Sequence, residues 1–243
     1  MKLKNPFSLL TRFELMLMSV SVITVALSFI LSPERDYLTL IASVVGVVAL
    51  IFISKGLIFG QVLVIIFAVF YGIVSFFFSY YGEMITYLLL TTPAAVAALV
   101  SWLKNPYESS RVVEVATLNR KKILLLSLFT ISVTVAFYFI LKALGNANLL
   151  VSTLSITTSA LGSALTILRS PLYAIAYALN DLVLITLWTL ATVESIAYLP
   201  MVFCFIMFLL NDLYGYFNWK RIRRSQGNDK PDSADTQKIT DNI

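Results

Sequence analysis

This chain of 243 residues contains no histidine and a single cysteine. Without histidine it lacks the commonest zinc ligand, the commonest general base and the commonest pH-responsive side chain. Cys204 has no second cysteine to pair with, and its neighbours MVFCFIMF favour a buried apolar side chain over a reactive thiol. The motifs HExxH, GxSxG and GxxxxGK[ST] are also missing. We therefore expect neither a metal nor a cofactor, and the sequence argues against a hydrolase and an ATP-driven pump.

Charge is equally scarce, because only 13% of the residues are charged while 59% are apolar. Soluble domains carry about 25% charged residues, so this composition indicates a membrane protein. The net charge of +5 could suggest nucleic-acid binding. However, the basic residues stand at the ends of apolar runs, where they are typical of topology signals.

Apolar runs of spanning length follow one another along the chain. A transmembrane helix needs about 20 mostly apolar residues. The first run is of full spanning length and others follow it, so we expect no removable signal peptide. The first two runs are divided only by SPERD (32–36), where Pro33 and three charges favour a turn. We predict an all-α membrane protein with eight spans, at residues 15–33, 37–54, 57–80, 84–103, 123–142, 147–168, 171–192 and 195–219.

The basic residues test this count. They gather at residues 2–12, 104–122 and 220–224. Eight spans and a cytoplasmic N-terminus place all three clusters on the cytoplasmic side, whereas seven spans would put one of them outside. We predict a multi-pass protein with both termini in the cytoplasm. Residues 222–243 are polar without an apolar period, which predicts a disordered cytoplasmic tail.

Spans two to four and six to eight share an arrangement. Each triple has a tight basic inner turn, ISKGLIFG (52–59) or ILRSPLYA (167–174), and its last helix ends in tryptophan and asparagine. The motif GLIFG within the first of these turns also suggests close helix packing. We predict two parallel three-helix bundles joined by span five, with a site near the midplane between them. The alternative is that short membrane loops resemble one another by chance. The predicted units are residues 1–36, 37–106, 107–146, 147–221 and 222–243, namely the first span with its turn, the first bundle, the loop with the linker helix, the second bundle and the tail.

The last span carries polar side chains at helical spacing. Asn211, Tyr214, Gly215 and Asn218 fall at i, i+3, i+4 and i+7, which places them on one stripe. Asn211 lies about 12 Å from the inner end of its helix, close to the midplane. Such a stripe favours a substrate site, although asparagine in membrane helices also bonds helices to one another.

Two other spans add comparable candidates. Tyr173, Tyr177 and Asn180 form a stripe in span seven, while span four offers Tyr87 and Thr91 beside a proline that frees a backbone carbonyl. Amides, hydroxyls and aromatic faces suit a planar heterocycle joined to a sugar.

The remaining candidates have two interpretations each. Trp102 and Trp219 are typical of interface anchors as well as of ligand or gate contacts, and Trp188 of an anchor or a gate. Asp181 and Asp212 are intramembrane acids and therefore functional candidates, for example in proton coupling. Asp212 could instead pair with a nearby basic residue.

Three segments together resemble the PnuC-type nicotinamide riboside transporters. They are YGEM…P…SWLKNP (81–106), AIAYALNDLVLITLWTL (174–190) and NDLYGYFNWKR (211–221), and the resemblance covers residues 55–224. It implies a SWEET-like fold, a homotrimer in the bacterial inner membrane, and nicotinamide riboside moving down its gradient until a cytoplasmic kinase traps it for NAD biosynthesis. It also implies that Asn180 and Asn211 contact the substrate and that Tyr214 lies at the inner gate. This chain departs from the family at Thr91 and Thr92, where relatives often have glutamine, and related subfamilies carry thiamine or riboflavin.

From these observations we expect a transporter rather than an enzyme, working by alternating access. The alternatives are a thiamine or riboflavin transporter, a proton-coupled variant using Asp181 or Asp212, and a membrane-embedded enzyme or importer subunit. The small-molecule vitamin and the lipid bilayer are the expected partners, with no nucleic acid. The candidate substrate-binding residues are Asn180, Asn211, Tyr177, Tyr214, Thr91, Tyr87 and Trp188, and the gate or interface candidates are Trp102, Asn105, Asn218, Trp219 and Tyr173.

Overall fold

The computed structural model describes residues 5–33, 37–77, 81–108, 110–146 and 148–228. Within these ranges it contains eight helical segments long and apolar enough to cross a membrane. The same residues form no β-strand, only two isolated bridges. The all-α fold with eight spans is therefore confirmed. The spans are α1 (Arg12–Leu31), α2 (Tyr37–Ser54), α3 (Ile58–Phe77), the composite α4 (Tyr81–Ile85), η2 (Thr86–Thr91) and α5 (Thr92–Lys104), α6 (Arg120–Ala143), α7 (Leu149–Ile167), α8 (Tyr173–Glu194) and α9 (Leu199–Asn228).

Helix boundaries follow local sequence signals. Thr11 caps α1 through a capping box, because its side chain accepts a hydrogen bond from the backbone N–H of Glu14, whose carboxylate accepts one from the N–H of Thr11. Helix α9 runs nine residues beyond the predicted end of the last span, at position 219, and ends at Asn228. The first seven residues of the predicted tail are therefore helical, and the rest, residues 229–243, lie outside the described residues.

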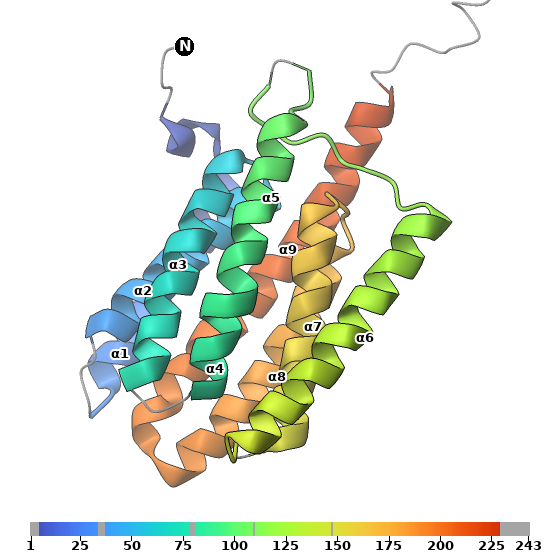
Figure 1. Ribbon diagram of the computed structural model, residues 1–243. Coiled ribbons are helices and arrows are strands. Elements are labelled where there is room, and N and C mark those ends of the chain that lie inside the picture. Colours follow the sequence, from blue (N-terminus) through green and yellow to red (C-terminus); the bar gives the residue numbers. More distant parts are fainter. Residues whose placement is uncertain (1–4, 34–36, 78–80, 109, 147, 229–243) are drawn as a thin grey trace, which may run out of the picture.

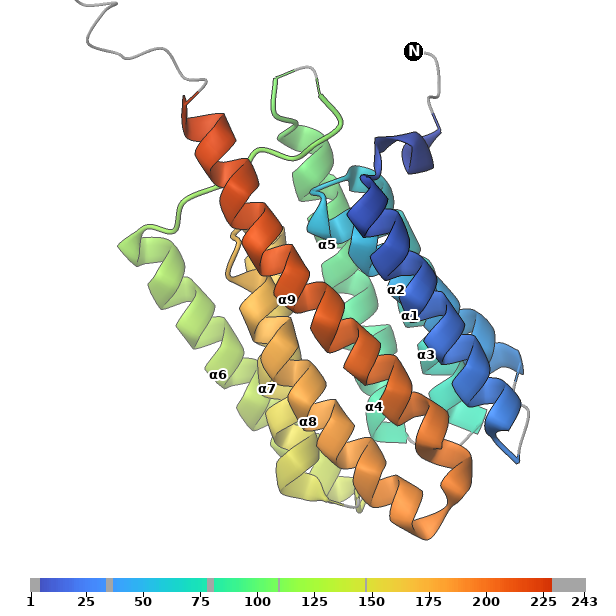
Figure 2. The same cartoon turned by 180° about the vertical axis from the view of Figure 1, so that it is seen from behind.

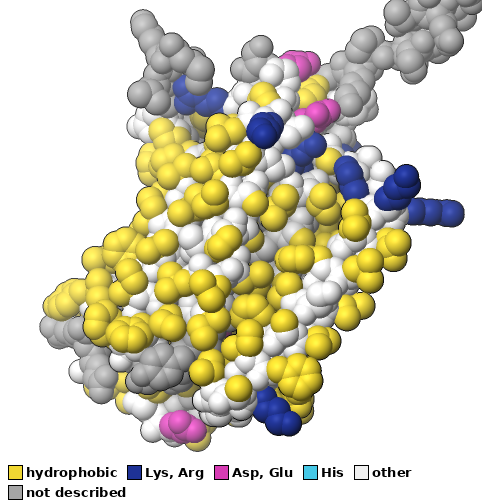
Figure 3. Space-filling view, in the orientation of Figure 1, with side chains coloured by type: hydrophobic (Ala, Val, Ile, Leu, Met, Phe, Trp, Pro, Cys, Tyr) yellow, Lys and Arg dark blue, Asp and Glu magenta, His cyan; other side chains and the backbone are white. Residues whose placement is uncertain are grey.

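The bundle has a central helix and two edges (Figures 1 and 2). Helix α9 packs against α1, α2 and α8, so it joins the two halves of the chain. Helix α1 flanks α2 and α9 at one edge, while α6 lies along α7 at the other. No residue in the most apolar window of α6 is buried within the chain. Lipid tails accept such a helix at no hydrophobic cost, which explains the apolar lateral surface in Figure 3.

The two ends of the bundle differ in charge (Figure 3). We call the end where α5 and α9 finish the basic end, since it carries Lys55, Lys104, Arg120, Arg169 and Lys220. The other end, where the chain turns from α8 to α9, is called the far end. The separation of charge matches the pattern that the sequence predicted.

Two tryptophans tie the triples together at the basic end. Trp102 at the end of α5 donates its indole N–H to the carbonyl of Thr166, near the end of α7, at 3.0 Å. Trp219 in α9 donates to the carbonyl of Ile53, near the end of α2, at 2.8 Å. Each bond runs from the third helix of one triple to the first helix of the other. This reciprocity supports the predicted arrangement of two similar triples.

The residues before these tryptophans repeat the relationship. Ser101 donates to the carbonyl of Ile167 at 2.7 Å, and Asn218 donates to the carbonyl of Ser54 at 2.9 Å. Four matched bonds therefore join the triples at this end.

The turns that follow α2 and α7 also match. Gly56 and Arg169 both have a positive φ, 68° and 57°, in the left-handed region that ends many helices. Close packing at GLIFG is explained by Gly60, because a Cβ there would lie 2.6 Å from the backbone nitrogen of Ile53. The sequence indicated this packing through its GxxxG spacing.

Residues 105–108 and 110–119, here called the strap, cross both turns. The N–H of Val113 donates to the carbonyl of Gly56 at 2.9 Å, and the N–H of Ala116 donates to the carbonyl of Arg169 at 3.0 Å. Gln226 of α9 holds the strap from the other side, because it donates to the carbonyl of Val113 and accepts from the N–H of Val115. The part of α9 beyond position 219 is therefore held against the strap.

Candidate functional site

A cavity lies between the two triples and receives side chains from both. The empty space between these side chains is about 800 Å³, counting the part that is open to the surroundings. Helices α2, α3 and α5 with η2 line one side, and α7, α8 and α9 line the other. The polar lining residues are Gln61, Tyr87, Thr91, Ser159, Ser163, Thr166, Tyr173, Tyr177, Asn180, Asp181 and Asp212.

Three of these side chains carry a buried polar atom without a partner. The amide nitrogen of Gln61, the hydroxyl of Thr91 and one carboxyl oxygen of Asp181 have no hydrogen-bond partner among the described residues. Leaving such a group unpaired costs about 1–3 kcal/mol. Three such atoms around one cavity point to a polar ligand that supplies their missing partners.

Gln61 is a candidate that the sequence reasoning missed. Its side chain is only 1% exposed, although it stands in a helix that is otherwise apolar. It is the only carboxamide in the predicted third span, at residues 57–80. That isolated amide was the signal that could have found it, because polar groups are costly inside a membrane.

The predicted stripe of α8 does face the cavity. Asn180 accepts hydrogen bonds at its amide oxygen from Ser155 and Thr158 of α7, at 3.2 and 2.9 Å. The Tyr177 hydroxyl bonds Ser163 of α7 at 2.9 Å. These bonds orient both side chains, and Tyr173 lines the cavity near its basic end.

The fourth span is distorted where it borders the cavity. Residues Thr86–Thr91 form a π-helical turn directly before Pro93, which lacks the N–H of a regular helix. The carbonyl of Tyr87 is nevertheless paired, because it accepts hydrogen bonds from both the hydroxyl and the N–H of Thr92. The turn leaves Tyr87 and Thr91 on the cavity wall.

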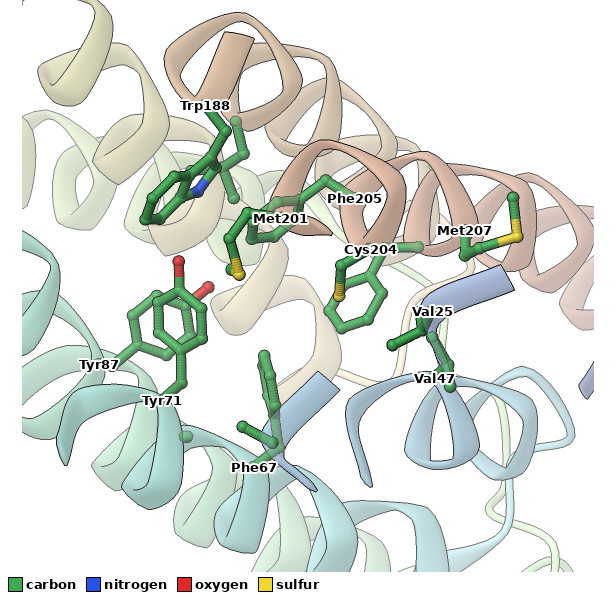
Figure 4. Packing of buried hydrophobic residues seen from close by; sticks show 14 residues of the cluster. Val25, Val47, Phe67, Tyr71, Tyr87, Trp188, Met201, Cys204, Phe205 and Met207 are labelled. Atoms are coloured by element: carbon green, nitrogen blue, oxygen red, sulfur yellow. The ribbon is translucent and has the colours of Figure 1, made fainter. Parts of the chain in front are cut away.

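Aromatic side chains close the far end of the cavity. The rings of Tyr71 and Tyr87 lie side by side with centroids 4.2 Å apart, and their hydroxyls point toward Trp188 (Figure 4). Phe67 and Phe205 pack against the same pair. Trp188 is buried in this cluster and does not line the cavity, so its ring does not lie at the membrane surface.

The tryptophans at the basic end are not membrane anchors. Trp102 and Trp219 are both 0% exposed, and a fully buried ring cannot lie at the lipid interface. Trp102 stands one helical turn beyond Ala98, and Trp219 two turns beyond Asp212, the last residues of α5 and α9 on the cavity wall. They therefore close the cavity toward the basic end, together with Tyr173, whose ring centroid is 4.9 Å from that of Trp219.

The predicted stripe of α9 faces another helix. Asn211 donates to the hydroxyl of Ser21 in α1 at 3.0 Å and to the carbonyl of Met207 at 2.6 Å. The Tyr214 hydroxyl donates to Glu14 of α1 at 2.8 Å. Neither residue lines the cavity, because α1 occupies that face of α9, and this position argues against the substrate contact that the sequence predicted.

Two further candidates, Asn105 and Asn218, and the inner-turn residue Lys55 make contacts outside the cavity. Lys55 completes an ion pair with Glu14 at 2.7 Å beside Tyr214. Asn218 bonds the end of α2, as described above, and Asn105 ends α5 by donating to the carbonyl of Ser101 at 2.7 Å. Asn218 thus joins α9 to α2 at the basic end, whereas the side-chain bond of Asn105 stays within the end of α5.

Among the described residues, no three histidine, cysteine, aspartate or glutamate side chains lie close enough together to hold a metal ion.

Comparison with known proteins identifies the family. The profile of the family described as nicotinamide mononucleotide transporter matches residues 36–221. The chain belongs to this family. Its relatives include a nicotinamide riboside transporter PnuC from Neisseria mucosa, 27% identical over 89% of this chain and 84% of that protein. A PnuC from Haemophilus influenzae is 25% identical over 86% of this chain and 90% of the relative.

A solved structure shares the fold. The crystal structure described as that of the vitamin B3 transporter PnuC superposes with a TM-score of 0.77 at 25% identity. The match covers 89% of this chain and 94% of the solved one. The resemblance seen in the three sequence segments is confirmed, and the chain is a multi-pass membrane protein of a transporter family.

Proposed function

We propose that this protein carries nicotinamide riboside across the membrane by facilitated diffusion. The observation that carries the proposal is the cavity between the triples, with the unpaired polar atoms of Gln61, Thr91 and Asp181 on its wall. Relatives named as nicotinamide riboside transporters support the choice of substrate.

The lining residues suit the parts of such a ligand. The amides of Gln61 and Asn180 can pair with a carboxamide, which needs both a donor and an acceptor. Thr91 can bond a ribose hydroxyl, and the rings of Tyr87 and Tyr177 can pack on a heterocycle.

The charge of the lining favours a riboside over a mononucleotide. No lysine or arginine stands among the described residues that line the cavity. A phosphate would enter this site without a cation to pair with, which is costly in a low-dielectric interior. We therefore assign the unphosphorylated form as the substrate.

The two aromatic clusters are the proposed gates. Trp102, Trp219 and Tyr173 would open toward the basic end, and Tyr71, Tyr87 and Trp188 toward the far end. Rocking of the two triples against each other would expose the cavity to each side in turn.

The proposal also covers the orientation of the protein in the membrane, the trapping of its substrate and its oligomeric state. The basic end would face the cytoplasm of a bacterium, with both termini on that side of the inner membrane. A cytoplasmic kinase would trap the riboside by phosphorylation, and the exposed apolar face of α6 is available for a homotrimer contact.

Uptake into proteoliposomes tests the function. The purified protein is reconstituted alone, and entry of labelled nicotinamide riboside is measured beside labelled thiamine and riboflavin. We expect saturable entry of the riboside that stops at equal concentrations inside and outside when no voltage is applied. Entry of thiamine or riboflavin in its place would overturn the substrate.

The same vesicles address the other mechanisms. Accumulation above the outside concentration under an imposed pH gradient would overturn facilitated diffusion in favour of proton coupling. A chemically altered product would indicate an enzyme, and no transport by the chain alone would indicate a subunit of a larger importer.

A further inference from the structure

Two carboxyl groups meet on the cavity wall. Asp181 of α8 and Asp212 of α9 are each only 3% exposed, and both line the cavity. The two carboxyl groups lie close enough to interact directly with each other. A hydrogen bond between two carboxyl groups requires a proton on one of them.

The surroundings do not neutralise this pair. The titratable groups that line the same cavity are Tyr173 and Tyr177 from α8 and Tyr87 from η2. The described lining residues of α2, α3, α5 and α7 include no acid or base. Two ionised carboxylates side by side without a cation would repel each other strongly, so one shared proton and one negative charge is the favoured state.

We propose that Asp181 and Asp212 share one proton and act together as a single-charge receptor for the positively charged ring of the ligand. The inference rests on the proposed function, because the riboside of nicotinamide is an N-substituted pyridinium cation. One oxygen of Asp181 has no partner among the described residues, although it is buried, and the cation is what would pair with it.

This receptor would determine which ligands the cavity selects. A monocation cancels the one negative charge and leaves the loaded cavity neutral. A neutral ring leaves the charge uncompensated, and a phosphate adds a second negative charge. The pair therefore accounts for selectivity that the amides alone would not provide, since an amide contact does not depend on charge.

A matched pair of ligands isolates the charge. Binding to the purified protein is measured by calorimetry with nicotinamide riboside and with its reduced form, the uncharged dihydropyridine riboside. The two ligands share the carboxamide and the ribose. We expect the cation to bind at least about tenfold more tightly, as is typical for an interaction with one ionised partner.

Isosteric variants then test the shared proton. In Asp181→Asn or Asp212→Asn, the new amide can donate the hydrogen bond that the shared proton made, and the remaining carboxylate keeps the single charge. Each single variant should retain the preference for the cation within about threefold. The double variant should lose the preference and still bind the reduced riboside, which also shows that its site is folded. Glu194→Gln, an exposed position at the end of α8, is the control and should change neither affinity.

The outcomes separate the two proposals. Equal affinity of the wild-type protein for both ligands would overturn the receptor while leaving the function standing. So would a preference that survives in the double variant, or one that each single variant loses completely. If the wild-type protein binds neither form, the proposed function fails and the receptor fails with it.

Discussion

The indole rings of Trp102 and Trp219 pack with their centroids 5.4 Å apart, and each ring donates its N–H to a carbonyl of the opposite triple. The carbonyls of Thr166 and Ile53 occupy equivalent places, near the ends of the first helices of the two triples. A motion that separates the triples at the basic end must break both bonds and part the rings. The pair is therefore the first place to test the proposed gate.

We expect Trp102→Phe and Trp219→Phe to loosen the basic end. Each change removes one indole hydrogen bond between the triples, worth about 0.5–1.5 kcal/mol of stability in the closed form. The carbonyl keeps its backbone donor, which is the N–H of Arg169 for Thr166 and the N–H of Gly56 for Ile53. Opening can be followed by thiol labelling of Ala98→Cys, a buried cavity position, in a Cys204→Ser background. Labelling from the basic end should become faster in either variant.

A neighbouring position supplies the control for this gate. Leu103 is 56% exposed and faces away from the bundle, so Leu103→Phe should leave the labelling rate unchanged. If the tryptophan variants label no faster than the wild-type protein, these rings do not close the cavity.

Two asparagines that look alike in the sequence should behave differently. Asn180→Leu should weaken binding of nicotinamide riboside by about tenfold or more, because Asn180 lines the cavity. Asn211→Leu should leave the affinity nearly unchanged and lower the melting temperature instead, because it breaks the bond to Ser21 between α9 and α1. Calorimetry and thermal unfolding in detergent measure both. Loss of binding in Asn211→Leu without a change in melting temperature would restore Asn211 as a substrate contact.

Two glutamines form a second contrasting pair. Gln61→Leu should reduce the affinity for nicotinamide riboside by about tenfold and leave stability equal or higher, since its amide nitrogen has no partner among the described residues to lose. Gln226→Leu should lower the melting temperature and leave the affinity unchanged, because it breaks two hydrogen bonds to the strap. Thermal unfolding measures the stability of each variant, and calorimetry on the same preparations measures its affinity for nicotinamide riboside. A marked drop in melting temperature for Gln61→Leu would indicate that its role is structural.

Gly162 should be required for the position of Tyr177. A Cβ at this glycine would lie 3.0 Å from three atoms of the Tyr177 ring, so Gly162→Ala must displace the ring within the cavity. We expect weaker binding, although alanine in a helix is intrinsically favoured over glycine by up to about 1 kcal/mol. Gly227→Ala, where nothing lies within 4 Å of the added Cβ, is the matched control and should change neither binding nor uptake. Unaltered affinity in Gly162→Ala would show that the Tyr177 ring is not held in place for the ligand.

The sequence by itself determined the eight spans, the basic character of one end of the bundle and the proline that interrupts the fourth span. These properties are local, because the length of an apolar run, the charges at its ends and a proline inside it act within a few residues. The stripe of Tyr177 and Asn180 on α8 was also predicted, and both residues line the cavity.

Only the tertiary structure decided which face of α9 meets the cavity. Asn211 and Asp212 are adjacent, so they lie about 100° apart around the helix axis and must face different neighbours. Helix α9 packs against α1, α2 and α8, and its periodicity does not say which stripe each of them covers. Helix α1 covers Asn211 and Tyr214, which leaves Asp212 to face Asp181. Gln61 entered the site for the same reason, since its place on the wall depends on how α3 packs against the rest of the bundle.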